Sequence, residues 1–411
     1  MIDQAVRGPL LVPEADGSVT YHADGMLAAD AEGKLVHVGP AIDVPHRASV
    51  GVMLPPLLDI HIHIPQHPIR GGFTKGVPDD APEGRLLAGL QKNVFPAEMR
   101  CADADHAAAV VEKFRADTLA HGIVGGAAYM TSSAVATEVA LELLPDTWSV
   151  GLVLMNQNCP DGIRIDEANL AENIERLAKR FGRRLIVTDR FAVAVDTPLR
   201  KQAAALAAEF GLRTQTHLNE QVAEKTFVER ELYPDAASYT DVYRRDGLLD
   251  HDCILAHCIH MRADEWAILR DTGSTVAHCP TSNVHLGSGV MPLDEVITRG
   301  IPYAIATDVG ASATVSMLAE MKRFLSVHES SHVTPAQALF RATRAPADLL
   351  DFAGGLGHLE PGRPMSFIEA DGGGADVDDV VRSLLPADMD APALTVNRVT
   401  LAGKLTYERD A

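Results

Sequence analysis

The segment "LLDIHIHIPQH", residues 57–67, ends an apolar run with two histidines that are separated by one residue. Successive side chains of a strand point to opposite faces, so His61 and His63 would lie on the same side of a strand. Two imidazoles side by side at a strand end are typical of a metal site. The chain contains 17 histidines, however, and such a pair also arises by chance. Further ligands in the same fold would distinguish these two interpretations.

Seven similar apolar, β-branched runs follow the first one along the chain. They are GIVGGAAYM (122–130), SVGLVLMN (149–156), RRLIVTDRF (183–191), LRTQTHLNE (212–220), DCILAHC (252–258), STVAHCP (274–280) and IPYAIATD (301–308). Stretches rich in Ala, Leu and Glu with helical spacing separate several of them, and some of these stretches stop at Gly. Eight such units predict an α/β fold, a (β/α)8 TIM barrel. A doubly wound open sheet is the alternative, but no Gly-rich dinucleotide loop follows the first run.

The two ends of the chain differ from this pattern, because both read as short strands joined by turns. We therefore expect a small β-sandwich domain formed from both termini, residues 1–52 and 356–411. The barrel would occupy residues 53–355. The stretch "DGGGADVDD", residues 371–379, has the composition of a surface loop.

The bulk composition restricts the classes of partner. The chain has 411 residues and a formal net charge of −20, which argues against nucleic acid and anionic membrane surfaces. Its five cysteines include no C-x-x-C pair, so neither a disulfide framework nor a zinc ribbon is indicated. We see no signal-peptide pattern and no apolar run long enough to cross a bilayer. A cytoplasmic location is the expectation.

Polar side chains gather where the runs end, and active sites of (β/α)8 barrels lie at the carboxyl ends of the strands. The residues at these ends are His61, His63, Asp189, Arg190, His217, Glu220, His257, His278 and Asp308. Imidazoles and carboxylates at most strand ends favour a metal site over chance. Three imidazoles and a carboxylate suit Zn²⁺, with Fe²⁺ as the alternative. His278 receives no role from the pattern.

Glu220 follows His217 by three residues, where the chain has begun to turn. In this place a carboxylate can reach over a metal-bound water and act as a proton shuttle. It can also be an acid in the first turn of a helix, where the helix dipole favours it. Position in the sequence does not separate these two roles.

The combination D-x-H-x-H in the first run, H-x-x-E in the fifth, His in the sixth and Asp in the eighth resembles the amidohydrolase superfamily. The fourth run does not end in a lysine that could be carbamylated, which resembles the mononuclear deaminase branch. Longer pieces resemble the guanine deaminase family within it. These pieces include "NVFPAEMR", "DRFAVAV", "LYPDAASYTDVYRRDGLL" and "AHCPTSNVHLGSG".

The resemblance implies a role for each matching residue. The metal ligands would be His61, His63, His217 and Asp308. The catalytic residues would be Glu220, which moves protons, His257, which contacts the metal-bound water, and Asp308, which can accept a proton from it. The substrate-binding residues would be Gln66, Arg190 and Phe191, with amide and guanidinium on the polar edges of a purine and phenyl on its face. Family habit suggests a homodimer.

The implied reaction is hydrolytic deamination of guanine to xanthine and ammonia by a metal-bound hydroxide, with a small-molecule purine as the substrate. Two departures from the family pattern surround the site: Asp189 stands where Pro is usual, and the run Val309–Ser312 replaces Val-Ala-Gly-Gly. Asp189 would be able to pair with Arg190. A pterin, an oxidised purine or an aminotriazine is therefore an alternative substrate. A catalytically silent ligand-binding barrel is a remote alternative, since it would lose one of the catalytic residues.

Overall fold

The computed structural model describes residues 1–351 and 355–410, which divide into two compact units. One unit consists of Ile60–Arg115 and Ala127–Thr314, and contains most of the barrel strands. The other consists of Met1–Asp59, Ala116–Gly126 and Val315–Ala411. The domain boundaries expected after residues 52 and 355 stay a prediction.

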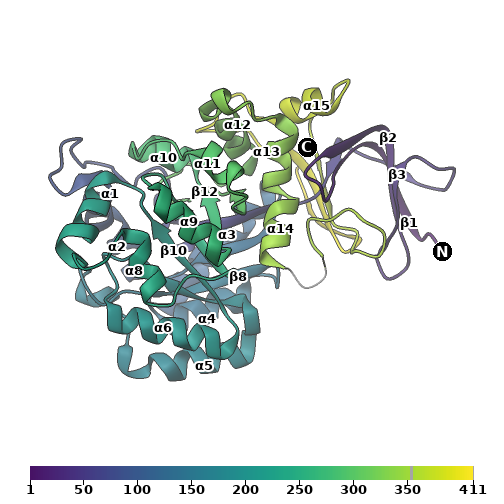
Figure 1. Ribbon diagram of the computed structural model, residues 1–411. Coiled ribbons are helices and arrows are strands. Elements are labelled where there is room, and N and C mark those ends of the chain that lie inside the picture. The colour runs from purple at the N-terminus through teal and green to yellow at the C-terminus, as the bar shows by residue number, and fades with distance from the viewer. Residues whose placement is uncertain (352–354, 411) are drawn as a thin grey trace. The chain divides into compact units, whose positions relative to one another are not determined.

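The barrel sheet has eight strands in the order of the chain. These strands are β6 (Leu57–His63), β7 (Ile123–Tyr129), β8 (Trp148–Leu154), β9 (Leu185–Asp189), β10 (Arg213–Leu218), β11 (Cys253–His257), β12 (Thr275–His278) and β13 (Tyr303–Ile305). Seven of them lie within the predicted runs, and β8 begins one residue before its run, at Trp148. Figure 1 labels β8, β10 and β12 of this sheet. Neighbours from β8 to β13 pair in parallel. The predicted (β/α)8 fold class is therefore confirmed.

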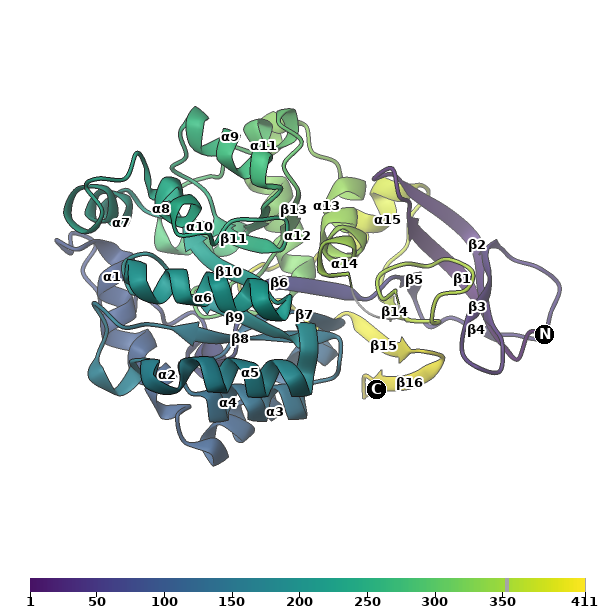
Figure 2. The same cartoon turned by 60° about the horizontal axis from the view of Figure 1, so that its bottom comes forward.

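Every residue of these eight strands is buried, as expected for a parallel sheet covered on both faces. Figure 2 shows helices along the outside of the strands, and α4, α5 and α6 contact β8 or β9 there. The helices associated with the barrel are α1 (Gly84–Gly89), α2 (Phe95–Arg100), α3 (Ala104–Ala120), α4 (Ala134–Leu143), α5 (Leu170–Phe181), α6 (Thr197–Phe210), α7 (Val222–Phe227), α8 (Tyr239–Arg245), α9 (Ala263–Thr272), α10 (Pro280–Leu286) and α11 (Leu293–Thr298). None of the helices in the described residues is both long and apolar enough to span a membrane.

The first and last strands of the barrel sheet meet at their carboxyl ends. The backbone N–H of Asp308, just after β13, donates to the carbonyl of His61 on β6 at 2.9 Å. This bond fixes Asp308 beside the histidine pair from the other end of the sheet. The closure of the barrel therefore brings together residues that lie about as far apart as the barrel sequence allows.

The second sheet takes strands from both ends of the chain, as predicted. Its order is β16-β15-β14-β5-β1-β2-β3, with β4 paired to β1. The strands are β1 (Gln4–Pro13), β2 (Val19–Ala29), β3 (Leu35–Pro40), β4 (Arg47–Ala48), β5 (Val52–Leu54), β14 (Phe367–Ala370), β15 (Val396–Leu401) and β16 (Lys404–Glu408). The same unit contains α12 (Met317–Val327), α13 (Pro335–Ala342), α14 (Arg344–Leu350) and α15 (Val377–Leu384). Leu10, Leu27, Met53 and Phe367 pack in one apolar cluster of this unit.

The loop predicted for residues 371–379 is shorter than expected. Residues 371–376 are exposed and irregular, but Val377 begins α15. The side chain of Asp376 accepts a hydrogen bond from the backbone of Asp379, which is the usual geometry of a helix N-cap. The prediction was wrong for residues 377–379.

Candidate metal and substrate site

Four buried side chains gather at the carboxyl ends of two barrel strands and in the segment after a third. The candidate ligand atoms of these side chains all lie within 4.8 Å of one another, and the residues are His61, His63, His217 and Asp308. The Nε2 atoms of His61 and His63 lie 3.4 and 3.2 Å from Oδ1 of Asp308. These are the four residues that the sequence pointed to as metal ligands, and the fold brings all of them together.

The local structure also sets which ring atom His217 offers to the cluster. Its Nδ1 lies 2.7 Å from the carbonyl oxygen of Arg190, so Nδ1 donates a proton to that oxygen. The Nε2 lone pair is then available for a metal, because a neutral imidazole has one donor and one acceptor nitrogen. A partner of this kind is common behind metal-binding histidines.

Burial keeps these imidazoles neutral. It lowers the pKa of His63 to about 3 and holds the pKa of His217 well below its usual range. Burial alone would raise the pKa of Asp308, but contacts with His61 and His63 hold it well below its ordinary value. Neutral imidazoles around an ionised carboxylate have the protonation states that metal binding requires.

A second pair of groups, Glu220 and His257, lies beside the cluster. Nε2 of His257 is 3.6 Å from Oε2 of Glu220 and 3.9 Å from Oδ2 of Asp308. The other nitrogen of His257 donates to Oδ1 of Asn283 at 2.9 Å. Ser288 Oγ donates to Oε1 of Glu220 at 3.0 Å. Both side chains are therefore held from behind while facing the same space.

Glu220 is not the acid that supports the helix start after β10. The acidic residue in the first turn of α7 is Glu224, whose carboxylate accepts from the backbone N–H groups of Glu220 and Gln221. Burial raises the pKa of Glu220 to about 7, which suits a group that both accepts and gives a proton near neutral pH.

A cavity opens over these residues, and its empty space together with the open solvent at its mouth amounts to about 340 Å³. Its polar lining includes Gln66, Arg190, His217, Glu220, His257 and Asp308, and its apolar lining includes Phe73, Leu86, Leu90, Phe191 and Leu286. A flat ring with polar edges fits this combination of walls. The three residues predicted to bind substrate therefore share one cavity with three of the four predicted ligands and with the proton-transfer groups. His278 ends β12 and is buried, and in the described chain it is not a member of the ligand cluster.

Glu98 on α2 is a residue of this site to which the sequence gave no role. Its Oε1 accepts hydrogen bonds from Nη1 of Arg190 and from Nε2 of Gln66, the latter at 3.2 Å. Burial raises the pKa of Glu98, and the neighbouring Arg190 opposes that shift. The motif "NVFPAEMR" contains Glu98, but only the fold shows that it contacts both residues of the predicted purine-binding wall.

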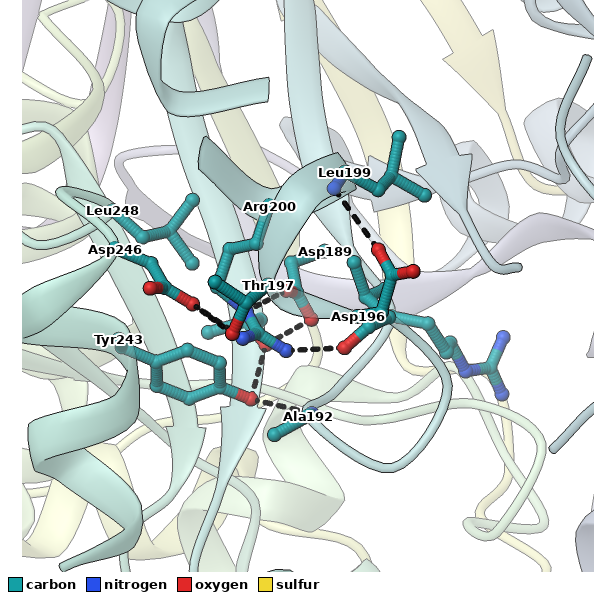
Figure 3. A network of polar contacts seen from close by, with 12 residues as sticks. Asp189, Ala192, Asp196, Thr197, Leu199, Arg200, Tyr243, Asp246 and Leu248 are labelled. Atoms are coloured by element: carbon teal, nitrogen blue, oxygen red, sulfur yellow. Dashed lines mark hydrogen bonds and ion pairs between the residues drawn. The ribbon is translucent and has the colours of Figure 1, made fainter. Parts of the chain in front are cut away.

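The predicted pairing of Asp189 with Arg190 is wrong. Oδ2 of Asp189 lies 2.6 Å from Nε of Arg200 on α6 (Figure 3). Arg200 also donates to Asp246 at 2.7 Å and to the carbonyl of Val195 at 2.6 Å. Adjacent residues at a strand end point to opposite faces, so Arg190 lines the cavity while Asp189 joins the buried network behind it.

The run Val309–Ser312, which differs from the Val-Ala-Gly-Gly of the family pattern, allows a close contact with Gln66. Gly310 has a φ of +128°, and a Cβ built there would lie 2.0 Å from Oε1 of Gln66. A side chain at this position would displace Gln66 from its place in the wall. The glycine of the Val309–Ser312 run therefore makes room for a predicted substrate-binding residue.

Comparison with known proteins is consistent with this geometry. The Amidohydrolase family matches residues 52–406. A probable guanine deaminase of Deinococcus radiodurans is 32% identical to this chain, over 86% of this chain and 84% of the relative. The structure of Escherichia coli guanine deaminase has a TM-score of 0.87 at 25% identity and covers 99% of both chains. A guanine deaminase from C. acetobutylicum with guanine bound in its active site has a TM-score of 0.86 at 21% identity, covering 98% of this chain and 100% of that one.

Proposed function

The chain belongs to the amidohydrolase family, and we propose that it is a metal-dependent aminohydrolase that converts guanine and water to xanthine and ammonia. One observation carries this proposal. A single buried cavity combines a ligand cluster, a Glu–His pair for proton transfer and a wall of amide and guanidinium donors. Each of these three parts has a separate task in hydrolytic deamination.

The donor set fits one divalent metal ion. Three buried imidazoles and one carboxylate form the cluster, and the Nδ1 of His217 is already engaged by a backbone carbonyl. We propose Zn²⁺ as the metal, with Fe²⁺ as the alternative. When bound, such an ion supplies the Lewis acidity that makes water a nucleophile near neutral pH.

We assign the proton transfers to residues beside the cluster. Glu220 or Asp308 accepts a proton from the attacking water as the new C–O bond forms at C2, the carbon that carries the exocyclic amine. Glu220 then gives this proton to the adjacent ring nitrogen. A second proton moves from the new hydroxyl group on C2 to the amine with the help of Glu220, so that the C–N bond breaks, the C2 carbonyl forms and ammonia leaves. The raised pKa of Glu220, about 7, supports both accepting and donating. His257, held by Asn283, stabilises the charge that develops during attack.

Recognition of the ring falls to the opposite wall. Arg190 offers a planar fork of donors to the carbonyl and ring nitrogen, and Gln66 adds an amide. Phe191 and the leucines of the cavity pack on the ring faces. These contacts hold C2 towards the cluster, so that the amine lies near Glu220.

The main argument for a related ring as the substrate, rather than guanine, no longer holds. It depended on Asp189 changing what Arg190 can bind, whereas Asp189 contacts Arg200 behind the wall. A pterin, oxidised purine or aminotriazine substrate thus has no specific contact in its favour. A silent ligand-binding barrel is also disfavoured, because Glu220, His257 and Asp308 all face one cavity. A homodimer and a cytoplasmic location stay predictions.

The test of this proposal is ammonia release by the metal-loaded protein across a panel of rings. We expect guanine to be turned over with the largest kcat/KM, ahead of pterin, an aminotriazine and 2-aminopurine. Turnover of a pterin or triazine with guanine left untouched would replace the substrate assignment. No ammonia from any ring would contradict the aminohydrolase assignment itself.

A further inference from the structure

A buried carboxylate supports the substrate wall from behind. Glu98 on α2 has no exposed surface, and its Oε1 accepts from both Arg190 and Gln66. Its Oε2 has no hydrogen-bond partner in the part of the chain that the structure describes. Gln66 and Arg190 line the cavity, so Glu98 lies directly behind two residues of its wall.

The first consequence concerns charge. The side chain of Arg190 is 3% exposed and that of Glu98 is 0% exposed, so the two form a buried ion pair. A buried charge without a partner is strongly unfavourable, and the pair as a whole carries no net charge. The wall therefore presents guanidinium donors to a ligand without presenting an uncompensated positive charge.

The second consequence concerns geometry. The amide nitrogen of Gln66 is directed to Glu98, while its Oε1 lies in the space that the missing side chain of Gly310 leaves. Arg190 is held by the same carboxylate. Side chains fixed before a ligand arrives lose less conformational entropy on binding, which favours affinity for the ligand that matches them.

Building on the deamination of guanine proposed above, we propose that Glu98 is a positioning residue that makes the cavity select electrically neutral rings over anionic ones. A neutral carbonyl accepts hydrogen bonds from the guanidinium without disturbing its pair with Glu98. A ring that carries a negative charge at the same edge meets the carboxylate of Glu98 nearby, and like charges brought together disfavour binding.

Two ligands of similar shape separate charge from size: purine-6-carboxamide, which is neutral, and purine-6-carboxylate, which is an anion at neutral pH. Their dissociation constants for the metal-loaded protein are measured by calorimetry. We expect the wild type to bind the carboxamide at least ~10-fold more tightly, as expected for a wall that opposes like charge. Glu98→Gln should shift this ratio by ~10-fold or more towards the carboxylate, because Arg190 then keeps its positive charge uncompensated.

Kinetics gives a second reading of the same variant. Glu98→Gln should raise KM for guanine more than it lowers kcat, with the metal content unchanged. Glu112→Gln is the matched control, since it removes the same charge from an exposed position on α3. It should leave both the ligand ratio and KM at the wild-type values.

A ratio that agrees within twofold between wild type and Glu98→Gln would overturn the proposal. Should Glu98→Gln fail to fold, Glu98→Asp keeps the charge but shortens the side chain, and it should raise KM while preserving the ligand ratio. Equal affinity of the wild type for both ligands contradicts the proposal without any variant. Absence of ammonia release from guanine is a different result, since it rejects the proposed function while the ligand ratio still tests Glu98.

Discussion

His217 and Glu220 come from one short segment, yet their side chains serve different purposes in the cavity. Asn219 between them has a φ of 51°, in the left-handed region that Asn tolerates better than most residues. Its side chain donates to the carboxylate of Glu265, which holds this turn in place. The turn lets His217 contribute to the ligand cluster while Glu220 lies over it. His257 and Asp308 also have positive φ, at 72° and 49°, so three residues around the site are held in a backbone conformation that is unfavourable for most side chains.

The role of Glu220 as a proton carrier leads to a prediction for a single atom change. Glu220→Gln keeps the shape of the side chain but cannot accept a proton from water, so kcat for guanine should fall by ~10²-fold or more. Metal content and thermal midpoint should remain those of the wild type. Steady-state kinetics with metal analysis checks this, with Glu231→Gln on the exposed surface as the control. Turnover within a few-fold of the wild type would remove Glu220 from the mechanism.

Arg190 should determine which purines are accepted. A site built around a substrate hydrogen bond rejects analogues that lack the partner group by as much as ~10⁴–10⁵-fold. Wild type should therefore strongly prefer guanine to 2-aminopurine, which lacks the oxygen at C6. Arg190→Met should remove most of this preference by lowering kcat/KM for guanine alone.

The control for this variant follows from the buried pair. Arg190→Met leaves Glu98 without its cation, whereas Arg190→Met combined with Glu98→Gln removes both charges of this pair. Both variants should lose the discrimination between the two purines, and the double variant should be the more stable of them. A wild-type preference that persists in both would show that another group reads C6.

At the scale of elements, the strands and major helices were predictable because their patterns are unambiguous. Strands buried on both faces are continuous apolar runs, and helices such as α6 and α9 end at Gly211 and Gly273 in the left-handed conformation. The short α2 and α15 could not be predicted in this way, since a helix of six or eight residues offers hardly two turns of periodicity. The role of Glu98 could not be predicted for the same reason, because its contacts depend on the position of α2.

Asp189 illustrates a second limit of the sequence. Its neighbour in sequence, Arg190, was the obvious cation, but the partner is Arg200, eleven positions later on α6. Local spacing gives the face on which a side chain lies, whereas the choice of partner depends on packing between β9 and α6. The ligand residues were predictable because barrel topology alone brings the strand ends together.

Arg200 on α6 bonds to three other parts of the barrel, so its replacement should lower the free energy of unfolding. It joins β9 through Asp189, the end of α8 through Asp246 and the segment after Phe191 through the carbonyl of Val195. Arg200→Met would leave Asp189 buried without a cation and Asp246 with only Lys201, at 3.9 Å. Breaking a buried pair in this way costs ~3–5 kcal/mol. Thermal unfolding of the metal-loaded protein should show the loss, together with a higher KM for guanine.

Two further variants make this prediction specific. Asp189→Asn added to Arg200→Met should recover part of the lost stability, because one buried charge is removed. Arg180→Met, on the exposed face of α5, should leave the midpoint unchanged although it also breaks ion pairs. A midpoint for Arg200→Met equal to that of Arg180→Met would contradict the structural role of Arg200.

For the whole molecule, the barrel unit contains every residue assigned to the site. The ligand cluster, Glu220, His257 and the substrate wall all belong to Ile60–Arg115 and Ala127–Thr314. The acidic character of the chain, with a formal net charge of −20, is compatible with a neutral small-molecule substrate. All residues of the proposed mechanism therefore belong to the same unit of the chain.

The most direct test of this account is a metal titration of activity. Metal-free protein is loaded with increasing Zn²⁺ while xanthine formation from guanine is followed in the same samples. Activity should be absent without metal, rise in proportion to the metal added and saturate at about one ion per chain, as expected for one set of three imidazoles and a carboxylate. Saturation only at two ions per chain, or no xanthine at any loading, would contradict a mononuclear guanine deaminase.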